Sequence, residues 1–471
     1  MDAGRARNLT READRAALRA HLGQRYAGRP VLVGPGVLAG FTSTVAMLEE
    51  AGATKVMVLS TARGAGPVPE RAEVVEVTTP PSATVTEELR ALDGLVRGLP
   101  PDVVDRIEAF DPDRAGVWVT QPFVTTDHPV LGRPVTGGRP AAFMALEDKV
   151  YAEELWEAAG VAHAPSRVVP AEKGALDEAS DAIGGVGGEA VWAGDAREGF
   201  HGGGNFVRWV GSAEERAEAL TFFARHCDRV RVLPFLEGVP CSVHGMVLPD
   251  GTAAFRPVEI AILRNRDART FTYGGLSTYW DPPPADRAQM REAVRRVGER
   301  LREAHGYRGA FGIDGVLTVD GFRPTELNPR LSAGAATVAS AVDRHLFVLL
   351  QAALVAGDDP GISAAELETA LVAMDAVRVG KPVAFGEGRS LGIDSFPVDW
   401  DGRRLRRAAA DTGTTFQVGQ TPTGFFARLD PCHLLGPGDR LAPLNAALLA
   451  FLDTEYDTGF GPVEPAPSVR G

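Results

Sequence analysis

The fold of this chain is decided by two neighbouring stretches, Phe311-Gly312-Ile313-Asp314 and Thr325-Glu326-Leu327-Asn328-Pro329-Arg330. Apolar runs stand before and after Asp320-Gly321, a dipeptide typical of the tight turn in a β-hairpin. Pro324 lies inside the second run and predicts a bulge or an edge position, because proline cannot donate to a strand ladder. The sequence therefore predicts two antiparallel strands with polar residues near their paired ends.

The polar side chains of this hairpin indicate a metal and phosphate site. Glu326, Asn328 and Arg330 alternate along an extended chain and share one face, and pairing would bring Asp314 beside them. Asp314, Glu326 and Asn328 offer the hard oxygen ligands that Mg²⁺ takes alongside phosphates. Arg330 adds a guanidinium fork for a phosphoryl group or an acyl phosphate. The alternative is a solvated hairpin with ordinary surface charge, since the E-x-N-x-R pattern alone is a modest signal.

The length of 471 residues exceeds one ordinary core and predicts several subdomains. Alternating strands and helices near the amino terminus predict a parallel sheet, so the expected class is α/β with α+β lobes. The predicted division is an N-terminal α/β domain at 1–145, further subdomains at 146–230 and 231–374, and a small C-terminal domain at 375–471. Beyond the hairpin, hydrophobic patterns predict helices over 11–26, 42–51, 146–159, 285–305 and 441–454 and strands over 30–33, 55–59, 166–169, 230–236 and 243–248.

Composition excludes several classes of partner. The net charge of −13 and the lack of a basic run argue against nucleic acid or an anionic membrane. No apolar run reaches the ~18 residues of a membrane span, and Met1–Arg5 lacks the apolar core of a secretory signal. Cys227, Cys241 and Cys432 show no metal-ligand spacing, so buried thiols in a reducing cytoplasm are expected.

Lysine is rare in this chain. Lys55, Lys149, Lys173 and Lys381 are the only lysines, and arginine carries nearly all the positive charge. A lysine at a phosphate-binding position therefore counts for more than it usually would.

Three further segments have two interpretations each. The loop Gly199–Asn205 could offer backbone N–H groups to a triphosphate or be a plain linker. The run Leu233–Gly238 could hold adenine or be a core strand with a turn. Gly34–Ala39 fits only the loose form of the dinucleotide fingerprint, and the next strand ends at Leu59-Ser60 without an acidic residue, so dinucleotide binding is disfavoured.

In this order the segments resemble the ATP-grasp superfamily of carboxylate–amine ligases, over about residues 146–345. Glu147-Asp148-Lys149 is similar to the first ATP-binding lysine and its helix, the glycine loop to the lid over the phosphates, and Leu233–Gly238 to the adenine hinge. Residues 1–145 resemble the pre-ATP-grasp domain in arrangement only. The resemblance implies these ATP contacts: Lys149, Gly202, Gly203, Gly204, Leu233, Phe235 and Glu237.

The resemblance also assigns metal and catalytic roles. Asp314, Glu326 and Asn328 match the family's Mg²⁺ ligands, and Arg330 matches the arginine that follows them. Arg256 stands where the family often places a basic residue near the γ-phosphate, so Arg256 and Arg330 are the implied catalytic residues. Ser332-Ala333-Gly334-Ala335 resembles the loop that holds a substrate carboxylate or acyl phosphate. The implied substrate-binding residues are Ser332, Gly334 and Ala335, with Glu259 as a candidate for a cationic donor.

Two departures from the family pattern concern the nucleotide. Trp192 stands about where the family has a second lysine, and Arg197, His201 or Arg208 could supply that charge instead. The ribose-binding glutamate after the hinge is also missing, since Pro240 and Cys241 occupy that stretch.

Within the superfamily, the domain order and the tail are most similar to the peptide ligases of pheganomycin-type antibiotic biosynthesis. That likeness implies a cytoplasmic enzyme joining a guanidino-type acid to the amino terminus of a peptide through an acyl phosphate, with ATP and Mg²⁺. The implied partners are a small carboxylic acid and a peptide or amine, and a homodimer is left open. The alternatives are an ATP-grasp carboxylase, although no biotin-accepting M-K-M is present, and an inactive nucleotide-binding scaffold, which Trp192 favours.

One basic and aromatic stretch has no assigned role. It could bind the donor carboxylate or an aromatic ring, or it could be an exposed loop. Its residues are Arg264, Arg266, Arg269, Phe271 and Tyr273.

Overall fold

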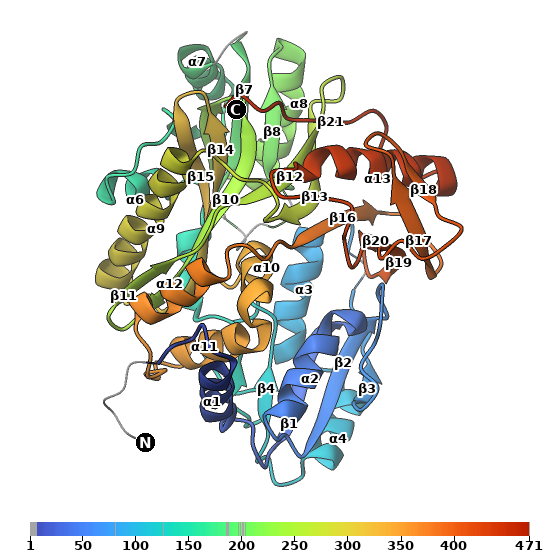
Figure 1. The fold of residues 1–471 in the computed structure, drawn as a ribbon. Coiled ribbons are helices and arrows are strands. Elements are labelled where there is room, and N and C mark those ends of the chain that lie inside the picture. Colours follow the sequence, from blue (N-terminus) through green and yellow to red (C-terminus); the bar gives the residue numbers. More distant parts are fainter. Residues whose placement is uncertain are drawn as a thin grey trace.

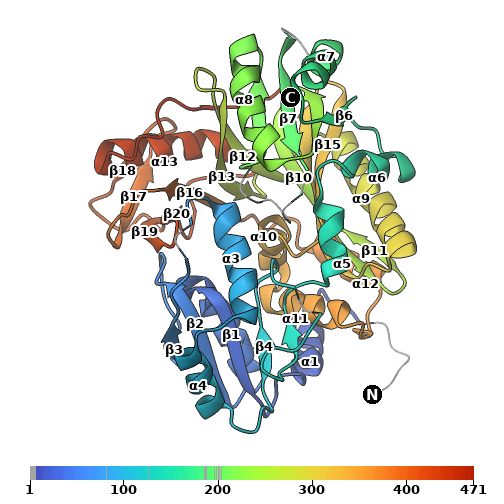
Figure 2. The same cartoon turned by 180° about the vertical axis from the view of Figure 1, so that it is seen from behind.

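The computed structural model describes residues 7–470 except 81, 126, 185–187, 196, 198, 200, 201 and 203. Two opposite views show an N-terminal lobe at one end of the molecule and a small α/β layer at the other, with a large sheet between them (Figures 1 and 2). None of the described helices is both long and apolar enough to cross a bilayer.

The N-terminal lobe consists of α1 (Glu12–Gly23), β1 (Pro30–Val37), η1 (Leu38–Phe41), α2 (Thr42–Glu50), β2 (Lys55–Ala62), β3 (Glu73–Glu76), α3 (Val85–Arg97), α4 (Pro101–Phe110), β4 (Val117–Val119), β5 (Val135–Thr136), α5 (Ala141–Met144) and η2 (Ala145–Glu147). Its five strands lie in the order β3-β2-β1-β4-β5, and all their pairings are parallel, which confirms the predicted parallel sheet. β1 is a continuous apolar run because both faces of the sheet are covered, and Val31, Leu32 and Val33 are fully buried.

The second layer consists of α6 (Ala152–Ala158), β6 (Arg167–Pro170), α7 (Lys173–Ile183), β7 (Ala190–Gly194), β8 (Val207–Val210), α8 (Ala213–His226) and β9 (Arg229–Pro234). Its four strands form an antiparallel sheet in the order β6-β9-β7-β8. Leu176 of α7 and Phe223 of α8 pack with Trp192 and Val232 of the sheet in one buried cluster.

The predicted continuous helix over 146–159 is wrong at its start. Only Ala152–Ala158 is α-helical, and Asp148 adopts an extended backbone (φ −65°, ψ 122°) after the short 3₁₀ turn η2. The ion pairs of Glu147 and Lys149, described below, hold this segment in a different path. Tertiary contacts therefore override the local helix propensity.

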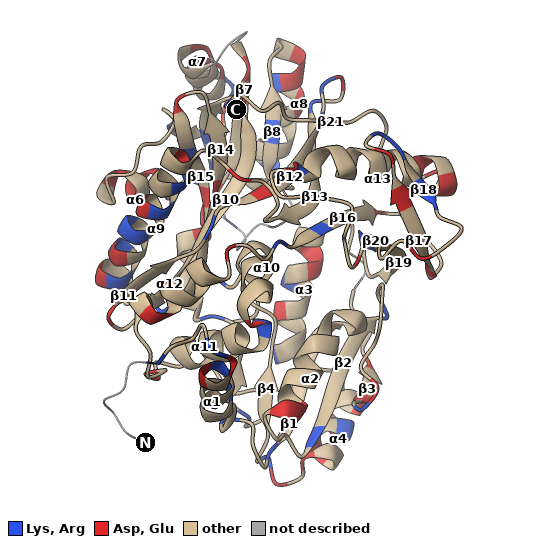
Figure 3. Ribbon diagram, in the orientation of Figure 1, with Lys and Arg blue, Asp and Glu red and all other residues tan. Residues whose placement is uncertain are grey.

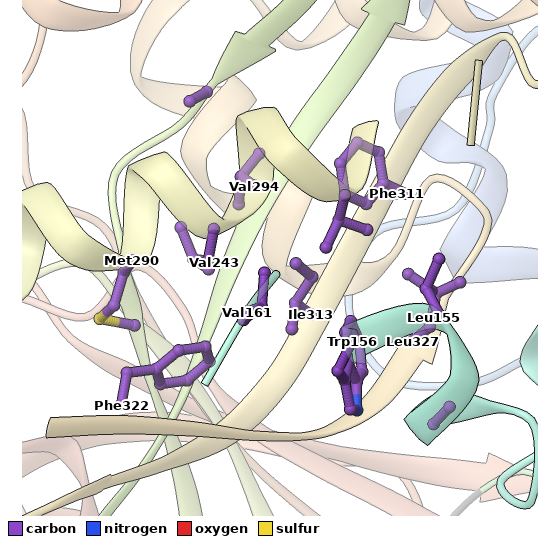
Figure 4. Close-up of a cluster of buried hydrophobic side chains, with 14 of the residues drawn as sticks. Leu155, Trp156, Val161, Val243, Met290, Val294, Phe311, Ile313, Phe322 and Leu327 are labelled. Atoms are coloured by element: carbon purple, nitrogen blue, oxygen red, sulfur yellow. The ribbon is translucent and has the colours of Figure 1, made fainter. Parts of the chain in front are cut away.

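The central sheet is formed by β10 (Val239–Leu248), β11 (Gly251–Ala254), β12 (Val258–Asn265), β13 (Thr270–Ser277), β14 (Gly309–Thr318) and β15 (Gly321–Asn328), with α9 (Pro284–His305) on one face. The predicted hairpin is confirmed as β14–β15, and the predicted helix over 285–305 is confirmed as α9. Figure 4 shows Met290 and Val294 of α9 packed on Val243, Phe311 and Ile313 of the strands. These side chains leave Asp314 on the opposite face.

That opposite face is covered by α10 (Ala333–Val342) and α11 (Arg344–Val355), which are followed by α12 (Ala364–Ala373). Val338 and Ala339 of α10 pack with Met246, Ala310 and Leu276 of the strands. The face that carries Asp314 is thus apolar where α10 lies on it.

The C-terminal region extends the same sheet. It consists of β16 (Gly380–Glu387), β17 (Asp394–Trp400), β18 (Leu405–Arg407), β19 (Thr415–Thr421), β20 (Gly424–Leu429), α13 (Leu441–Tyr456) and β21 (Glu464–Pro465). β16 pairs with β13, so the sheet continues across residue 375 and reaches 12 strands. The predicted helix over 441–454 is confirmed as α13, whereas the division of the chain at 145, 230 and 374 stays a prediction.

Candidate active site

The strand register brings the predicted metal ligands together. Asp314 lies directly opposite Glu326, and Asn328 lies opposite Gly312. The amide nitrogen of Asn328 donates to Asp314 Oδ2 at 3.0 Å. A bulge at Pro324 and Thr325 shifts the register just before this point, as the proline predicted, on a strand at the edge of the sheet. The predicted convergence is confirmed, and metal binding stays a prediction.

The electrostatics of this site fit a divalent cation. Burial, together with the Glu326 carboxylate opposite, raises the pKa of Asp314 to about 6, and a hydrogen bond from Ser242 acts against the rise. Lys149 forms an ion pair with Glu326. Among the described residues, no group of three or more His, Cys, Asp or Glu side chains could hold a metal ion by itself. A magnesium ion here would need the two carboxylates, the Asn328 oxygen and phosphates of the nucleotide as ligands. The Asn328 amide would have to be flipped for this, because its nitrogen now faces Asp314.

Arg330 is held by a buried network. Its Nη2 donates to Asn328 Oδ1 at 2.6 Å and to Glu147 Oε1 at 2.9 Å. Glu147 also forms an ion pair with Arg139, and its side chain is 1% exposed. The guanidinium lies 4.4 Å from the ring centroid of Phe123. Residues of the N-terminal segment therefore fix the orientation of Arg330, a role for Glu147 that the sequence analysis missed.

Trp192 stands where a second lysine was expected, and the structure indicates Arg231 as another source of that positive charge. Trp192 is a core residue, 1% exposed, and its Nε1 donates to Ser180 Oγ at 2.8 Å. Arg231 of β9 pairs with Ala193, on the other face of the same sheet, and donates to the carbonyl oxygen of Thr325 at 2.7 Å. Its Nε forms an ion pair with Glu153 at 3.0 Å, and its Nη2 is buried without a hydrogen-bond partner among the described residues. The sequence analysis overlooked Arg231 because it lies 39 positions from Trp192 along the chain.

The earlier candidates for that charge have other contacts. Arg197 lies 3.2 Å from Asp228, and Arg208 donates to the carbonyl oxygens of Asn205 and Val207. His201 lies outside the described residues. Of Arg197, Arg208 and Arg231, Arg231 is the one for which a hydrogen bond to the hairpin is described.

The glycine loop contacts the N-terminal lobe. The N–H of Gly202 donates to Thr86 Oγ1 of α3 at 3.0 Å, and this hydroxyl donates back to the Gly202 carbonyl at 2.9 Å. Gly204 has φ +74°, and Gly203 lies outside the described residues. A contact of Gly202 with phosphate stays a prediction and would have to replace its hydrogen bond to Thr86.

The segment predicted as the adenine hinge follows β9. Leu233 is buried, and the N–H of Phe235 donates to the Glu189 carbonyl at 3.1 Å. The Phe235 ring stacks on Trp209 with centroids 4.4 Å apart, and Glu237 forms an ion pair with Arg264. Adenine binding here stays a prediction.

Two predicted residues have contacts away from the hairpin. Arg256 lies 2.8 Å from Asp281 and 3.1 Å from Asp375, so its guanidinium is already neutralised. Glu259 is fully buried, and its oxygens accept hydrogen bonds from Arg440 and from the N–H groups of Leu441 and Ala442. This geometry favours a structural role for Glu259 in capping α13.

The predicted substrate loop opens α10. Ser332 Oγ accepts from the Ala335 N–H at 3.4 Å. A Cβ atom at Gly334 would come within 2.2 Å of the His244 ring, so this position requires glycine. His244 is buried, its Nε2 lies 3.1 Å from Ser242 Oγ, and burial lowers its pKa to about 3. Ser242 and His244 thus connect Asp314 to the loop, a link that no sequence motif indicated.

The stacked stretch after Glu259 forms ion pairs. Arg269 lies 2.5 Å from Glu189 and 3.1 Å from Glu215, and Phe271 stacks on Trp209 at 5.4 Å. These contacts join β13 to the second layer and leave Arg269 without free charge for a donor.

Comparison with known proteins identifies the architecture. A carboxyaminoimidazole ribonucleotide synthase from Aspergillus clavatus, complexed with ATP, superposes with a TM-score of 0.52 at 12% identity, over 90% of this chain and 98% of that chain. An N5-carboxyaminoimidazole ribonucleotide synthetase in complex with ADP superposes with a TM-score of 0.51 at 12% identity, over 91% and 98%. The chain has the ATP-grasp fold. At this identity the likeness establishes the ATP-grasp fold alone.

One curated relative is similar in sequence. A D-alanine–D-alanine ligase from Mycobacterium ulcerans (strain Agy99) is 27% identical over 206 residues, which are 42% of this chain. The match spans 54% of that ligase, so about half of its length is represented. No family model matches the chain.

Proposed function

We propose that this ATP-grasp chain is an ATP-dependent carbon–nitrogen ligase that joins a carboxylic acid to an amine. The observation that carries the proposal is the convergence of Asp314, Glu326 and Asn328, with Lys149 and Arg330 bonded directly to this group. The sequence match to a ligase and the fold shared with ADP- and ATP-bound synthetases support it.

The proposed reaction has two steps. A carboxylate oxygen of the donor attacks the γ-phosphorus of ATP, the bond to the bridging oxygen breaks, and an acyl phosphate and ADP form. The amine nitrogen then attacks the acyl carbon, the bond to the phosphate oxygen breaks, and the amide, inorganic phosphate and a proton are released. When bound, Mg²⁺ would offset the charge of the phosphates.

The protein groups have separate tasks in this proposal. Asp314, Glu326 and Asn328 hold the cation, and Lys149 and Arg231 balance the anionic charge at the lid side. Arg330, fixed by Glu147, stabilises the oxyanion of the second step. The N–H groups at Gly334 and Ala335 lie at the start of α10, where a helix favours a carboxylate or phosphate.

The finer assignment is a guanidino-type acid joined to the amino terminus of a peptide in antibiotic biosynthesis. It rests on the likeness in domain order and tail to pheganomycin-type peptide ligases. Both carboxylate oxygens of Glu259 already accept hydrogen bonds, so Glu259 has none free for a guanidinium group of the donor. A different acidic side chain of the protein would have to supply that contact. A carboxylase is the second candidate, because the two solved structures described above are carboxyaminoimidazole synthases.

The test is release of ADP in a screen of acids, amines and bicarbonate. We expect ADP release that requires both an acid and an amine in the wild type, and a loss of about 10³-fold in Glu326→Gln at unchanged melting temperature. Thr325→Ser, a change beside the site, serves as the control. ADP release with bicarbonate alone would favour the carboxylase, and normal turnover in Glu326→Gln would refute the site.

A further inference from the structure

The face that carries Asp314 also carries a second set of charged residues. Asp314 pairs with Ser242, and Ser242 pairs with Val258. Two residues along β12, Ile260 pairs with Leu276, which pairs with Lys381 of β16. Directly paired residues point to the same side of an antiparallel sheet. Lys381 therefore lies on the same face of the sheet as Asp314. The row of paired residues that contains Lys381 is two residues along β12 from the row that contains Asp314.

The next strand adds a guanidinium to this face. Lys381 and Val383 alternate along β16 to the same side, and Val383 pairs with Arg428 of β20. Arg428 is thus a diagonal neighbour of Lys381. Its Nε donates to Gln417 at 2.8 Å and its Nη2 lies 3.2 Å from Asp430.

Arg344, the first residue of α11, completes a basic cluster that we define as Lys381, Arg344 and Arg428. Arg344 is exposed and Lys381 is partly exposed. Neither side chain makes a hydrogen bond or ion pair with any residue in the described part of the chain. Burial, together with the charges of Arg344 and Arg428, lowers the pKa of Lys381 to about 8, and Asp430 opposes this fall. Three cations thus share one acidic partner, Asp430.

The composition makes this cluster unusual. Lys381 is the only lysine after position 173, in a chain of net charge −13. Figure 3 shows basic segments on β16 and near β20, beside the N-terminal lobe. Elsewhere, the arginines on β12 and in the turn before β13 are matched by glutamates, as with Arg264 and Glu237 or Arg269 and Glu189.

We propose that the basic cluster binds a carboxylate of the acceptor substrate, so that the acceptor is a short peptide with a free carboxyl group. The proposal rests on the proposed ligase function, because it places the amine of the acceptor near Asp314. The aromatic rings of Tyr273 and Phe385, 6.2 Å apart, lie on the same face, further along β13 and β16 than the Leu276–Lys381 pair. They suit an acceptor with apolar side chains.

The sheet sets the reach that such an acceptor needs. Four strand spacings separate β14 from β16, in the order β14-β10-β12-β13-β16, or about 19 Å at ~4.8 Å per spacing. A fully extended peptide covers at most about 3.3 Å per residue. A peptide that spans the two backbone positions therefore has about six residues, and a shorter one reaches both sites only where the side chains of the basic cluster extend toward Asp314.

The experiment measures binding by calorimetry on the full chain, with di- to hexa-alanine and the C-terminal amide of each peptide. Inorganic phosphate is a third ligand, because the same cations suit phosphate. The variants are Lys381→Met, Arg344→Met and Lys381→Arg. Arg403→Met, which removes one charge from an exposed site between β17 and β18, is the matched control. Melting temperatures verify that each variant is folded.

We expect at least one peptide acid to bind about tenfold more tightly than its amide. Lys381→Met and Arg344→Met should abolish this difference, and Lys381→Arg and Arg403→Met should keep it. Equal binding of acid and amide, no peptide binding, or tight binding of phosphate alone would overturn the proposal. Since turnover is not required, failure of the ligase proposal in the ADP assay would not alter this readout.

Discussion

One end of the 12-stranded sheet, at β14–β15, and its middle, at β16–β20, differ in how their charges are paired. At the β14–β15 end, Glu326 and Arg330 have partners of opposite charge within the protein, namely Lys149 and Glu147. In the β16–β20 region, Lys381 and Arg344 make no such contact with any described residue. The β14–β15 end is assembled before a ligand arrives, whereas the β16–β20 region has positive charge in excess.

This difference has a chemical reason. Groups that stabilise a transition state gain most when their geometry is fixed beforehand. Groups that bind a substrate carboxylate gain from being free until the substrate arrives, because a bound internal carboxylate would compete. The comparison therefore assigns chemistry to the β14–β15 end and recognition to the β16–β20 region.

Of the predictions in this comparison, the largest change in kcat is expected for Arg330→Ala, which removes a fixed contact at the β14–β15 end. Arg330→Ala should lower kcat by about 10²–10³-fold with little change in KM for ATP, because a transition-state contact is lost while nucleotide binding remains. Glu147→Gln should lower kcat by about tenfold or more, since it releases the orientation of Arg330. The measurement is steady-state ADP release with the acid and amine identified in the screen.

Arg330→Lys provides the control for charge. A lysine keeps the positive charge and loses the fork that contacts both Glu147 and Asn328. A kcat close to wild type in Arg330→Lys and Glu147→Gln would contradict the preassembled geometry, and would leave Arg330 as a simple point charge.

The same contrast explains what could be predicted from the sequence. Asp314, Glu326 and Asn328 lie on one hairpin, so alternation and the Asp320-Gly321 turn sufficed to bring them together. Their supporting residue Glu147 is 179 positions before Glu326, and only tertiary packing joins them. The same packing broke the predicted helix over 146–159.

The basic cluster could not be predicted for a related reason. Lys381, Arg344 and Arg428 come from three elements, and their common face depends on a register that crosses five strands. The extra residue of β13 between Leu276 and Tyr273 also changes which side chains face Asp314. No periodicity in the sequence signals that bulge, although Gly275 at φ +106° is compatible with it.

A smaller effect is expected at Lys381 in the β16–β20 region when the pH changes. The pKa of Lys381 is about 8, so its charge is present at pH 7 and is mostly lost by pH 9. The Kd of the peptide acid should therefore rise about tenfold between pH 7 and pH 9. The side chain in Lys381→Arg stays charged over this range. The ratio of the wild-type Kd to the Lys381→Arg Kd cancels the titration of the peptide's own amine, because that titration affects both proteins equally. A ratio that does not change with pH would contradict free charge at Lys381.

The smallest expected effect tests the preassembled end through His244. Burial lowers its pKa from 6.5 to about 3, so the folded chain resists protonation that the unfolded chain accepts. The contribution is fully present above pH 6.5, and the free energy of unfolding should fall by at most about 1.4 kcal/mol per pH unit between pH 6.5 and 4. His244→Gln should lack this component, so the difference between the two pH profiles isolates it from other titrating groups. Side-chain NMR of wild-type His244 should show a neutral ring down to about pH 4. Parallel pH profiles of the unfolding free energy in wild type and His244→Gln, or an imidazolium of His244 near pH 6, would contradict this prediction. Either result would show that the loop around Gly312 and Gly334 is open enough to solvate a charge. The β14–β15 end would then not be rigid before substrate binds.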